Sequence, residues 1–76
     1  MPHLTCIPWI KFEKFLLFIG CEFKRENGDH RIYSREGIKR PIVVPRDKAV
    51  PKFIIKNNLN VLGVSVAEYL EILERI

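Results

Sequence analysis

Residues 21–34 read CEFKRENGDHRIYS, and this stretch decides the fold. Apolar and polar residues alternate over 21–24 and again over 30–34, which is the period of a half-buried β-strand. Asn27-Gly28 stands between the two stretches, and this dipeptide is the strongest short-range signal for a β-hairpin. The sequence therefore predicts two antiparallel strands joined by a tight turn.

A third, short strand is predicted over residues 42–44. These residues are β-branched and are bounded by Pro41 and Pro45. The segments that join the three strands are too short for a crossover connection, so we expect a single antiparallel meander.

The first helix is predicted over residues 8–19. Apolar residues recur there on one helical face, between Pro8 and the helix-stopping Gly20: Trp9, Phe12, Leu16 and Ile19. Leu17 and Phe18 fall outside this face. Because so small a fold has little else to cover them, we expect them to form a partner surface, whereas full burial of both would assign them to the core.

Two further helices are predicted towards the C-terminus. Ser65 and Glu68 have the spacing of a capping box, which predicts a short final helix. Before it, apolar residues at helical spacing follow Pro51 and stop at Gly63: Phe53, Ile54, Ile55, Leu59 and Leu62. The predicted fold is α+β with the order α-β-β-β-α-α, in which the helices cover one face of the sheet and leave the other available.

The length of 76 residues predicts one small domain over residues 1–76. Such a chain has no room for a nucleotide-binding sheet fold, a barrel enzyme or a deep cofactor cavity. The longest apolar run, residues 15–19, is far short of the roughly 20 residues of a membrane span. No secretory signal is evident, and two cysteines without a disulfide framework favour reduced thiols, so we expect a cytoplasmic protein with no membrane partner.

Basic residues are concentrated in the middle of the chain. Residues 24–56 hold ten basic and four acidic side chains, whereas residues 57–76 carry a net charge of −2. The basic segment suits a polyanion such as RNA or DNA. The simpler interpretation is a solvated charged face.

The soft metal ligands are scattered along the sequence: His3, Cys6, Cys21 and His30. None of them has the paired spacing of a zinc site, so we expect no bound metal. Each glycine is expected in a turn or at the end of a helix, and no glycine-rich phosphate loop is present. We accordingly expect no small-molecule cofactor.

His30 directly follows the predicted hairpin turn. Basic residues surround it in the sequence: Lys24, Arg25, Arg31 and Arg35. Imidazole is the side chain best suited to proton transfer at neutral pH, and RNA supplies its own nucleophile, the 2′-hydroxyl. Taken alone, this pattern is also that of an ordinary exposed hairpin histidine.

Three stretches together resemble the HicA family of toxin messenger-RNA interferases. They are GCEFKRENGDH at 20–30, PIVVPR at 41–46 and LGVSVAEYL at 62–70. The resemblance covers about residues 8–73 and keeps the spacing from Gly20 through Gly28 to His30. It implies a fold like a double-stranded-RNA-binding domain, with a three-stranded antiparallel sheet and helices on one face.

The resemblance further implies a toxin endonuclease that cleaves messenger RNA without metal. His30 would be the catalytic residue and Gly28 the motif glycine that shapes the turn, with Lys24, Arg25 and Arg31 as candidates for phosphate contact. The implied partner is a HicB-like antitoxin that covers the active site.

The sequence departs from the family pattern at two positions. Asp29 replaces the motif serine, and Asp47 stands where the family motif ends in histidine. Both changes add negative charge near the expected RNA path. An alternative function is therefore a non-catalytic RNA-binding or antitoxin-binding module of the same fold. A purely structural interaction domain is a third possibility, but it leaves the basic middle of the chain unexplained.

Overall fold

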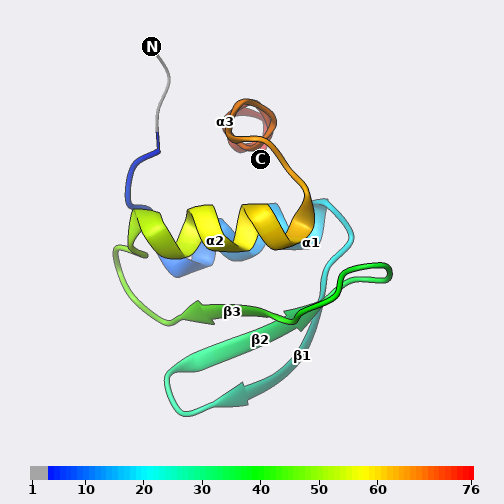
Figure 1. Ribbon diagram of the computed structural model, residues 1–76. Coiled ribbons are helices and arrows are strands. Elements are labelled where there is room, and N and C mark those ends of the chain that lie inside the picture. The colour runs from blue at the N-terminus through cyan, green and yellow to red at the C-terminus, as the bar shows by residue number, and fades with distance from the viewer. Residues whose placement is uncertain (1–3) are drawn as a thin grey trace.

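The computed structural model describes residues 4–76. Its elements follow the predicted order (Figure 1): α1 (Trp9–Phe18), β1 (Glu22–Asn27), β2 (His30–Ser34), β3 (Ile42–Pro45), α2 (Lys52–Leu62) and α3 (Val66–Arg75). The predicted α-β-β-β-α-α order is thus confirmed, and the bounds of α1 differ from the predicted ones by one residue at each end.

The three strands form one antiparallel sheet in the order β1-β2-β3. Gly28 lies in the turn between β1 and β2 with a φ of 63°, a left-handed conformation that glycine adopts without strain. The register of β1 against β2 shifts between Phe23 and Arg25, which leaves Lys24 as the extra residue of a bulge. The hairpin and meander predicted from the sequence are both present.

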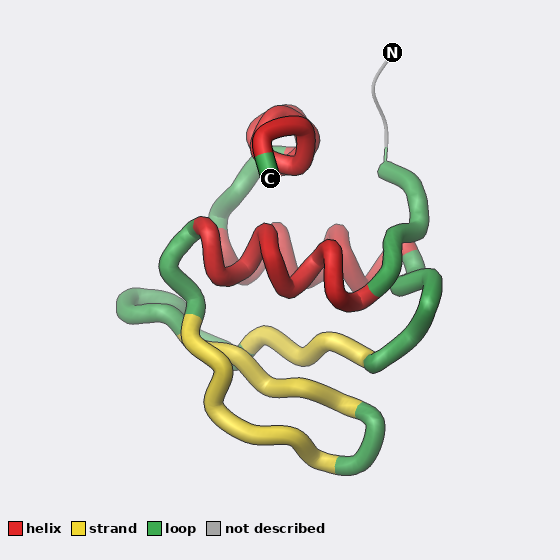
Figure 2. Tube along the Cα trace, turned by 180° about the vertical axis from the view of Figure 1, so that it is seen from behind, coloured by secondary structure: helices red, strands yellow, loops and turns green. Residues whose placement is uncertain are grey.

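The helices lie on one side of the sheet, and the other side is open (Figures 1 and 2). The helix α2 packs on β3, whereas α3 packs on α1 and α2. The side chains of Tyr33, Ile42 and Val44 have no exposed area, so these three residues face the helices. The open face consists of the residues that alternate with them.

An aromatic cluster joins α1 to α3 beneath the outer surface of the helices. The ring of Phe15 lies 4.8 Å from that of Tyr69 in an edge-to-face arrangement, and Phe12 contacts both rings. Such pairs stabilise a fold by about 0.5–1.5 kcal/mol beyond the burial of their area. The cluster attaches α3 to the rest of the molecule.

Local sequence signals explain where α2 and α3 end and begin. Gly63 ends α2 in the left-handed conformation, with a φ of 72°. The capping box predicted for Ser65 and Glu68 is present, because the Ser65 hydroxyl accepts a hydrogen bond from the Glu68 amide and the Glu68 carboxylate accepts one from the Ser65 amide.

Arg35 joins the ends of two helices from the segment after β2. Its guanidinium donates hydrogen bonds to the carbonyl oxygens of Ile19 and Leu62, at 3.3 and 3.0 Å. A cation at this position satisfies carbonyls that have no partner within their helix and interacts favourably with both helix dipoles. Arg35 is therefore committed to the fold.

Two expectations about burial were wrong. In the half-buried strand predicted from residue 21, Cys21 is buried, but every residue of β1 itself is exposed. The side chain of Phe53, counted in the apolar stripe of α2, is 67% exposed. It lies two residues before the buried Ile55, which turns it about 200° around the helix axis.

The exposure expected for the end of α1 is confirmed. The side chains of Leu17 and Phe18 are 51% and 57% exposed, and Ile10 is exposed on the same helix. We call Ile10, Leu17 and Phe18 the α1 patch. These residues are not part of the core, so the interpretation that assigned Leu17 and Phe18 to it is excluded.

Candidate active site

His30 is the first residue of β2, at the end of the hairpin turn. Its backbone is paired with Asn27 across the turn and with Pro45 on β3, so the position of its Cα is held from both sides. The side chain is exposed and forms no hydrogen bond or ion pair within residues 4–76. The structure thus presents an imidazole with both ring nitrogens free for a ligand.

The strand register places His30 on the open face of the sheet. Directly paired residues share a face, and alternate residues of a strand do so as well. His30 therefore lies on the same face as Ile32, which is paired with Arg25 on β1 and with Val43 on β3. Of the predicted phosphate contacts, Arg25 is exposed on this face and forms no ion pair with a described residue.

Lys24 projects from the bulge of β1 beside this face. Its ammonium group is 3.6 Å from the carboxylate of Glu22, and both side chains are largely exposed. An exposed pair of this kind contributes only about 0–1 kcal/mol. Lys24 can therefore leave the carboxylate of Glu22 and bind a phosphate instead.

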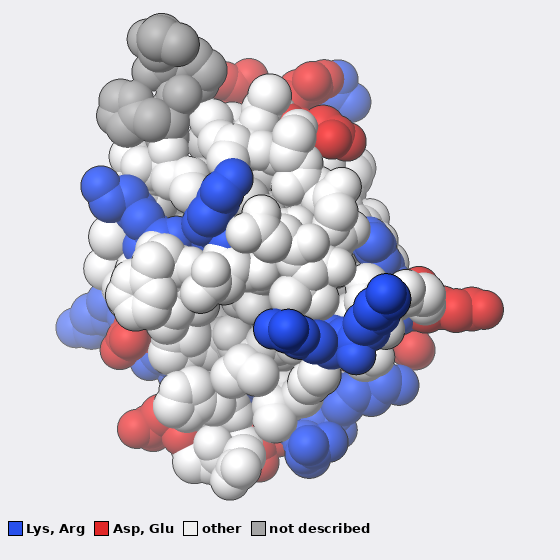
Figure 3. Space-filling view, viewed as in Figure 1, with Lys and Arg blue, Asp and Glu red and all other residues white. Residues whose placement is uncertain are grey.

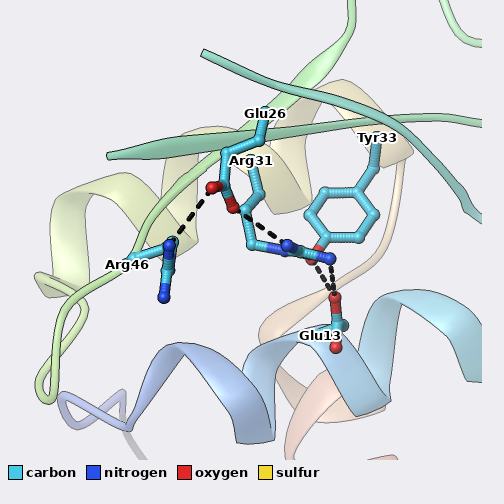
Figure 4. A network of polar contacts seen from close by, with 5 residues as sticks. All are labelled: Glu13, Glu26, Arg31, Tyr33 and Arg46. Carbon is cyan, nitrogen blue, oxygen red and sulfur yellow. Dashed lines mark hydrogen bonds and ion pairs between the residues drawn. The ribbon is translucent and has the colours of Figure 1, made fainter. Parts of the chain in front are cut away.

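Arg31 lies on the covered face, in the centre of a polar network (Figure 4). Its guanidinium pairs with carboxylate oxygens of Glu13 and Glu26, both at 3.0 Å, and its Nε donates to the hydroxyl of Tyr33. The guanidinium also lies 4.0 Å from the centre of the Phe23 ring. The side chain is 20% exposed, so the structure separates Arg31 from the other three predicted RNA-binding residues.

The network perturbs the ionisation of two of its members. The hydrogen bond with Tyr33 and those with Glu26 and Glu13 raise the pKa of Arg31 above its already high usual value. Burial, together with a hydrogen bond donated to Glu13, raises the pKa of Tyr33 to about 12. At neutral pH the network therefore contains a charged guanidinium and a neutral phenol.

Arg46 attaches the segment after β3 to the hairpin. Its amide donates a 2.8 Å hydrogen bond to the carbonyl oxygen of Asp29, and its guanidinium pairs with Glu26 at 3.1 Å. The same guanidinium lies 5.5 Å from the centre of the Trp9 ring. Sequence reasoning did not select Arg46, although it ends the PIVVPR stretch that carries the resemblance.

Asp29 and Asp47, the two acidic residues that depart from the family pattern, both form backbone hydrogen bonds with other segments. The carbonyl oxygen of Asp29 accepts from Arg46, and that of Asp47 accepts a 3.0 Å hydrogen bond from the amide of Trp9. The side chains of Asp29 and Asp47 are exposed. These contacts attach the turn and the first turn of α1 to the same segment.

Within residues 4–76, no three His, Cys, Asp or Glu side chains come together as ligands for a metal ion. His3, one of the soft ligands considered above, lies outside the described residues. The described part of the chain also contains no helix long and apolar enough to cross a membrane.

The fold and the site define a small basic α+β protein with an exposed histidine and exposed cations on one face of its sheet. Comparison with known protein families finds a match of residues 9–64 to the HicA toxin of bacterial toxin–antitoxin systems. The match covers most of the chain, which therefore belongs to the HicA toxin family. No curated protein and no solved structure matches the chain.

Proposed function

We propose that this toxin is a messenger-RNA interferase, an endonuclease in which His30 transfers a proton. The observation that carries the proposal is the exposed imidazole on the open face, held by backbone pairing on both sides and accompanied by the free cation of Arg25. The uncovered sheet gives a large substrate access to this group from outside (Figure 2). The net charge of +4 favours a polyanionic substrate.

The proposed reaction uses the 2′-hydroxyl of RNA as the nucleophile. Its oxygen attacks the adjacent phosphorus, and the bond from phosphorus to the 5′-oxygen of the next nucleotide breaks, so the products are a 2′,3′-cyclic phosphate and a 5′-hydroxyl. His30 either takes the proton from the 2′-hydroxyl or gives one to the leaving 5′-oxygen. This transfer contributes roughly 10²–10⁴-fold in rate and needs no metal ion or other cofactor.

The neighbouring residues have separate roles in this proposal. Lys24 and Arg25 contact phosphates of the RNA, and Gly28 gives the turn its shape. Arg31, with its guanidinium committed to two carboxylates, holds the hairpin against α1 and makes its contribution to RNA binding through this positioning.

The proposed partner is a HicB-like antitoxin that covers His30 and also contacts the α1 patch. The first turn of α1 lies next to the segment that follows β3, because the amide of Trp9 donates a hydrogen bond to the carbonyl oxygen of Asp47. Leu17 and Phe18 lie at the other end of the helix, so the antitoxin must extend along α1 to contact both regions. We propose that residues 1–76 act as one domain and that the protein works in the cytoplasm, where messenger RNA and the antitoxin are present.

The test compares the wild-type protein with His30→Ala and His30→Gln on messenger RNA in the presence of a chelator. We expect cleavage by the wild type, a loss of roughly 10²–10⁴-fold in both variants, and unchanged melting curves. Lys48→Ala serves as a control, because this exposed residue forms no ion pair with a described residue. Undiminished cleavage by the variants would place the chemistry elsewhere.

A second candidate function is a non-catalytic RNA-binding or antitoxin-binding module. It is favoured because no second titratable side chain within residues 4–76 forms a hydrogen bond or ion pair with the exposed His30. RNA binding without cleavage by the wild type supports this module. Cleavage that requires a divalent metal contradicts the 2′-hydroxyl mechanism. The carboxylates of Glu26, Asp29 and Asp47 would then be the candidate metal ligands.

A further inference from the structure

A groove runs along the outer edge of β3, between the loop that precedes this strand and α2. Its volume is about 760 Å³, within the size range of small-ligand sites. Cations, amides and small apolar side chains line it: Lys39, Arg40, Val43, Asn57, Asn60 and Val61. We propose that this groove is a second RNA subsite, which binds a nucleotide of the same strand that His30 cleaves.

The charges of the groove favour a phosphate group. Lys39 and Arg40 are exposed and form no ion pair or side-chain hydrogen bond with the described residues. None of the described lining residues carries a carboxylate. In Figure 3, basic side chains project from the loop between β2 and β3, beside an uncharged surface between α2 and β3. The loop therefore supplies cations that the fold itself does not use.

The helix side of the groove supplies amides that suit the edge of a nucleobase. The side chains of Asn57 and Asn60 are exposed and have no hydrogen-bond partner within residues 4–76. An amide combines donors with an acceptor, and unpaired RNA bases are recognised through hydrogen bonds to such edges. Val43 and Val61 add apolar surface for the base. These residues provide the two elements of nucleotide recognition, a cation for the phosphate and amides for the base.

Asn58 argues for RNA over an extended peptide as the occupant. Its Nδ2 donates a 3.1 Å hydrogen bond to the carbonyl oxygen of Val43, and the residue is only 8% exposed. A peptide that added a strand to the sheet would need the backbone groups of the β3 edge. The side chain of Asn58 occupies one of these groups, whereas a nucleotide that binds through side chains does not compete with it.

The groove is continuous with the face that carries His30. Val43 lines the groove and is paired with Ile32, and Pro45, two residues further along β3, is paired with His30. Two residues of a strand span about 7 Å. A single RNA strand that passes His30 can therefore also reach the groove. The inference rests on the proposed function, because it assumes that the strand at His30 is RNA.

The first experiment measures cleavage by two double variants, Lys39→Gln/Arg40→Gln and Asn57→Ala/Asn60→Ala. Loss of the cations should raise KM and lower the slope of log affinity against log salt by roughly 0.7 for each phosphate contact removed, with kcat nearly unchanged. Loss of the amides should relax the base preference beside the cut by roughly tenfold. The alanines should not weaken α2, because alanine has the higher helix propensity.

The matched control for the cations is Lys14→Gln/Lys48→Gln, which removes the same charge from exposed positions outside the groove. An equal rise in KM in this control would mean that net charge alone is responsible, and the inference would be rejected. Unchanged KM, salt slope and base preference in both groove variants, with cleavage by the wild type intact, would also reject it. That result would leave the proposed function standing.

A second measurement does not depend on cleavage. A short single-stranded RNA is added to His30→Ala, and the backbone amide shifts of Val43 and Val61 are followed by NMR. Shifts that saturate with RNA and vanish in the Lys39→Gln/Arg40→Gln background support the subsite, even if the wild type fails to cleave and the proposed function falls. Shifts caused by an acidic peptide and not by RNA would assign the groove to a protein partner and overturn the inference.

Discussion

Arg31 and Glu13 form an ion pair of 3.0 Å between Nη2 and Oε2, which joins the central strand β2 to α1. The same Glu13 oxygen accepts the hydroxyl of Tyr33, so one carboxylate oxygen receives donors from two residues of β2. Both partners of the ion pair are about one-fifth exposed. The hairpin that carries His30 is thereby attached to the helix layer at one partly buried point.

Arg31→Met should lower the free energy of unfolding by about 2–3 kcal/mol. The substitution leaves the carboxylate of Glu13 without a cation and leaves Glu26 paired with Arg46 alone. Because the site is partly exposed, the cost should stay below the roughly 3–5 kcal/mol of breaking a fully buried pair. Urea unfolding at neutral pH measures the change. Arg75→Met is the control, because the Arg75–Glu71 pair is exposed and its loss should cost under about 0.5 kcal/mol. Equal losses in the two variants would contradict the central role of Arg31.

Tyr69→Phe should stabilise the protein by about 1 kcal/mol. Tyr69 is 1% exposed, and its hydroxyl has no hydrogen-bond partner within residues 4–76, so the substitution removes a buried polar group that folding leaves unsatisfied. Tyr33→Phe is the matched comparison and should destabilise, because its hydroxyl bonds with Glu13 and Arg31. Melting curves of both variants measure these opposite effects, and a lower melting temperature for Tyr69→Phe would disprove the expectation.

The same tyrosine has a consequence at alkaline pH. Burial raises the pKa of Tyr69 to about 12 from a usual value of 10.0. The folded state therefore holds the phenol proton more tightly than the unfolded state does. Ionisation of this group leaves the stability unchanged below pH 10 and lowers it as the pH rises towards 12. The wild type should therefore lose more stability than Tyr69→Phe between pH 9 and 11.5 in urea unfolding. Parallel losses in the two proteins would contradict the raised pKa.

Lys24→Gln/Arg25→Gln should weaken RNA binding and reduce its dependence on salt. Each phosphate contact removed from a single-stranded RNA should lower the slope of log affinity against log salt by roughly 0.7, because fewer counterions are released. Fluorescence anisotropy with His30→Ala as the background separates binding from cleavage. Lys14→Gln/Lys48→Gln removes the same charge elsewhere, and an equal change in that control would assign the effect to net charge.

Leu17→Ser/Phe18→Ser should abolish or strongly weaken binding of the antitoxin and leave the toxin folded. Both side chains are more than half exposed in the free chain, so their removal creates no core cavity and should cost little stability. A pull-down with a HicB-like antitoxin, together with melting curves, measures the two effects. Phe53→Ser is the control, since Phe53 is equally large and more exposed but lies on α2. Unchanged binding by the α1 variant would remove the patch from the proposed interface.

The sequence by itself determined the order of the elements and most of their ends. Asn27-Gly28 specified the hairpin, Gly63 the end of α2, and Ser65 with Glu68 the start of α3. These signals act between residues that are at most a few positions apart, so they can be identified without knowing the fold. The position of His30 at the start of β2 was predictable for the same reason.

Only the tertiary structure decided which charged and polar side chains are free. Arg25 and Arg31 both lie within a few residues of the hairpin turn, but the register turns Arg31 towards Glu13 on α1 and leaves Arg25 on the open face. In the same way, Asn58 contacts a strand 15 residues earlier in the chain and forms part of the groove beside it. Whether a cation meets a carboxylate depends on contacts between distant segments, and local sequence patterns carry no information about such contacts.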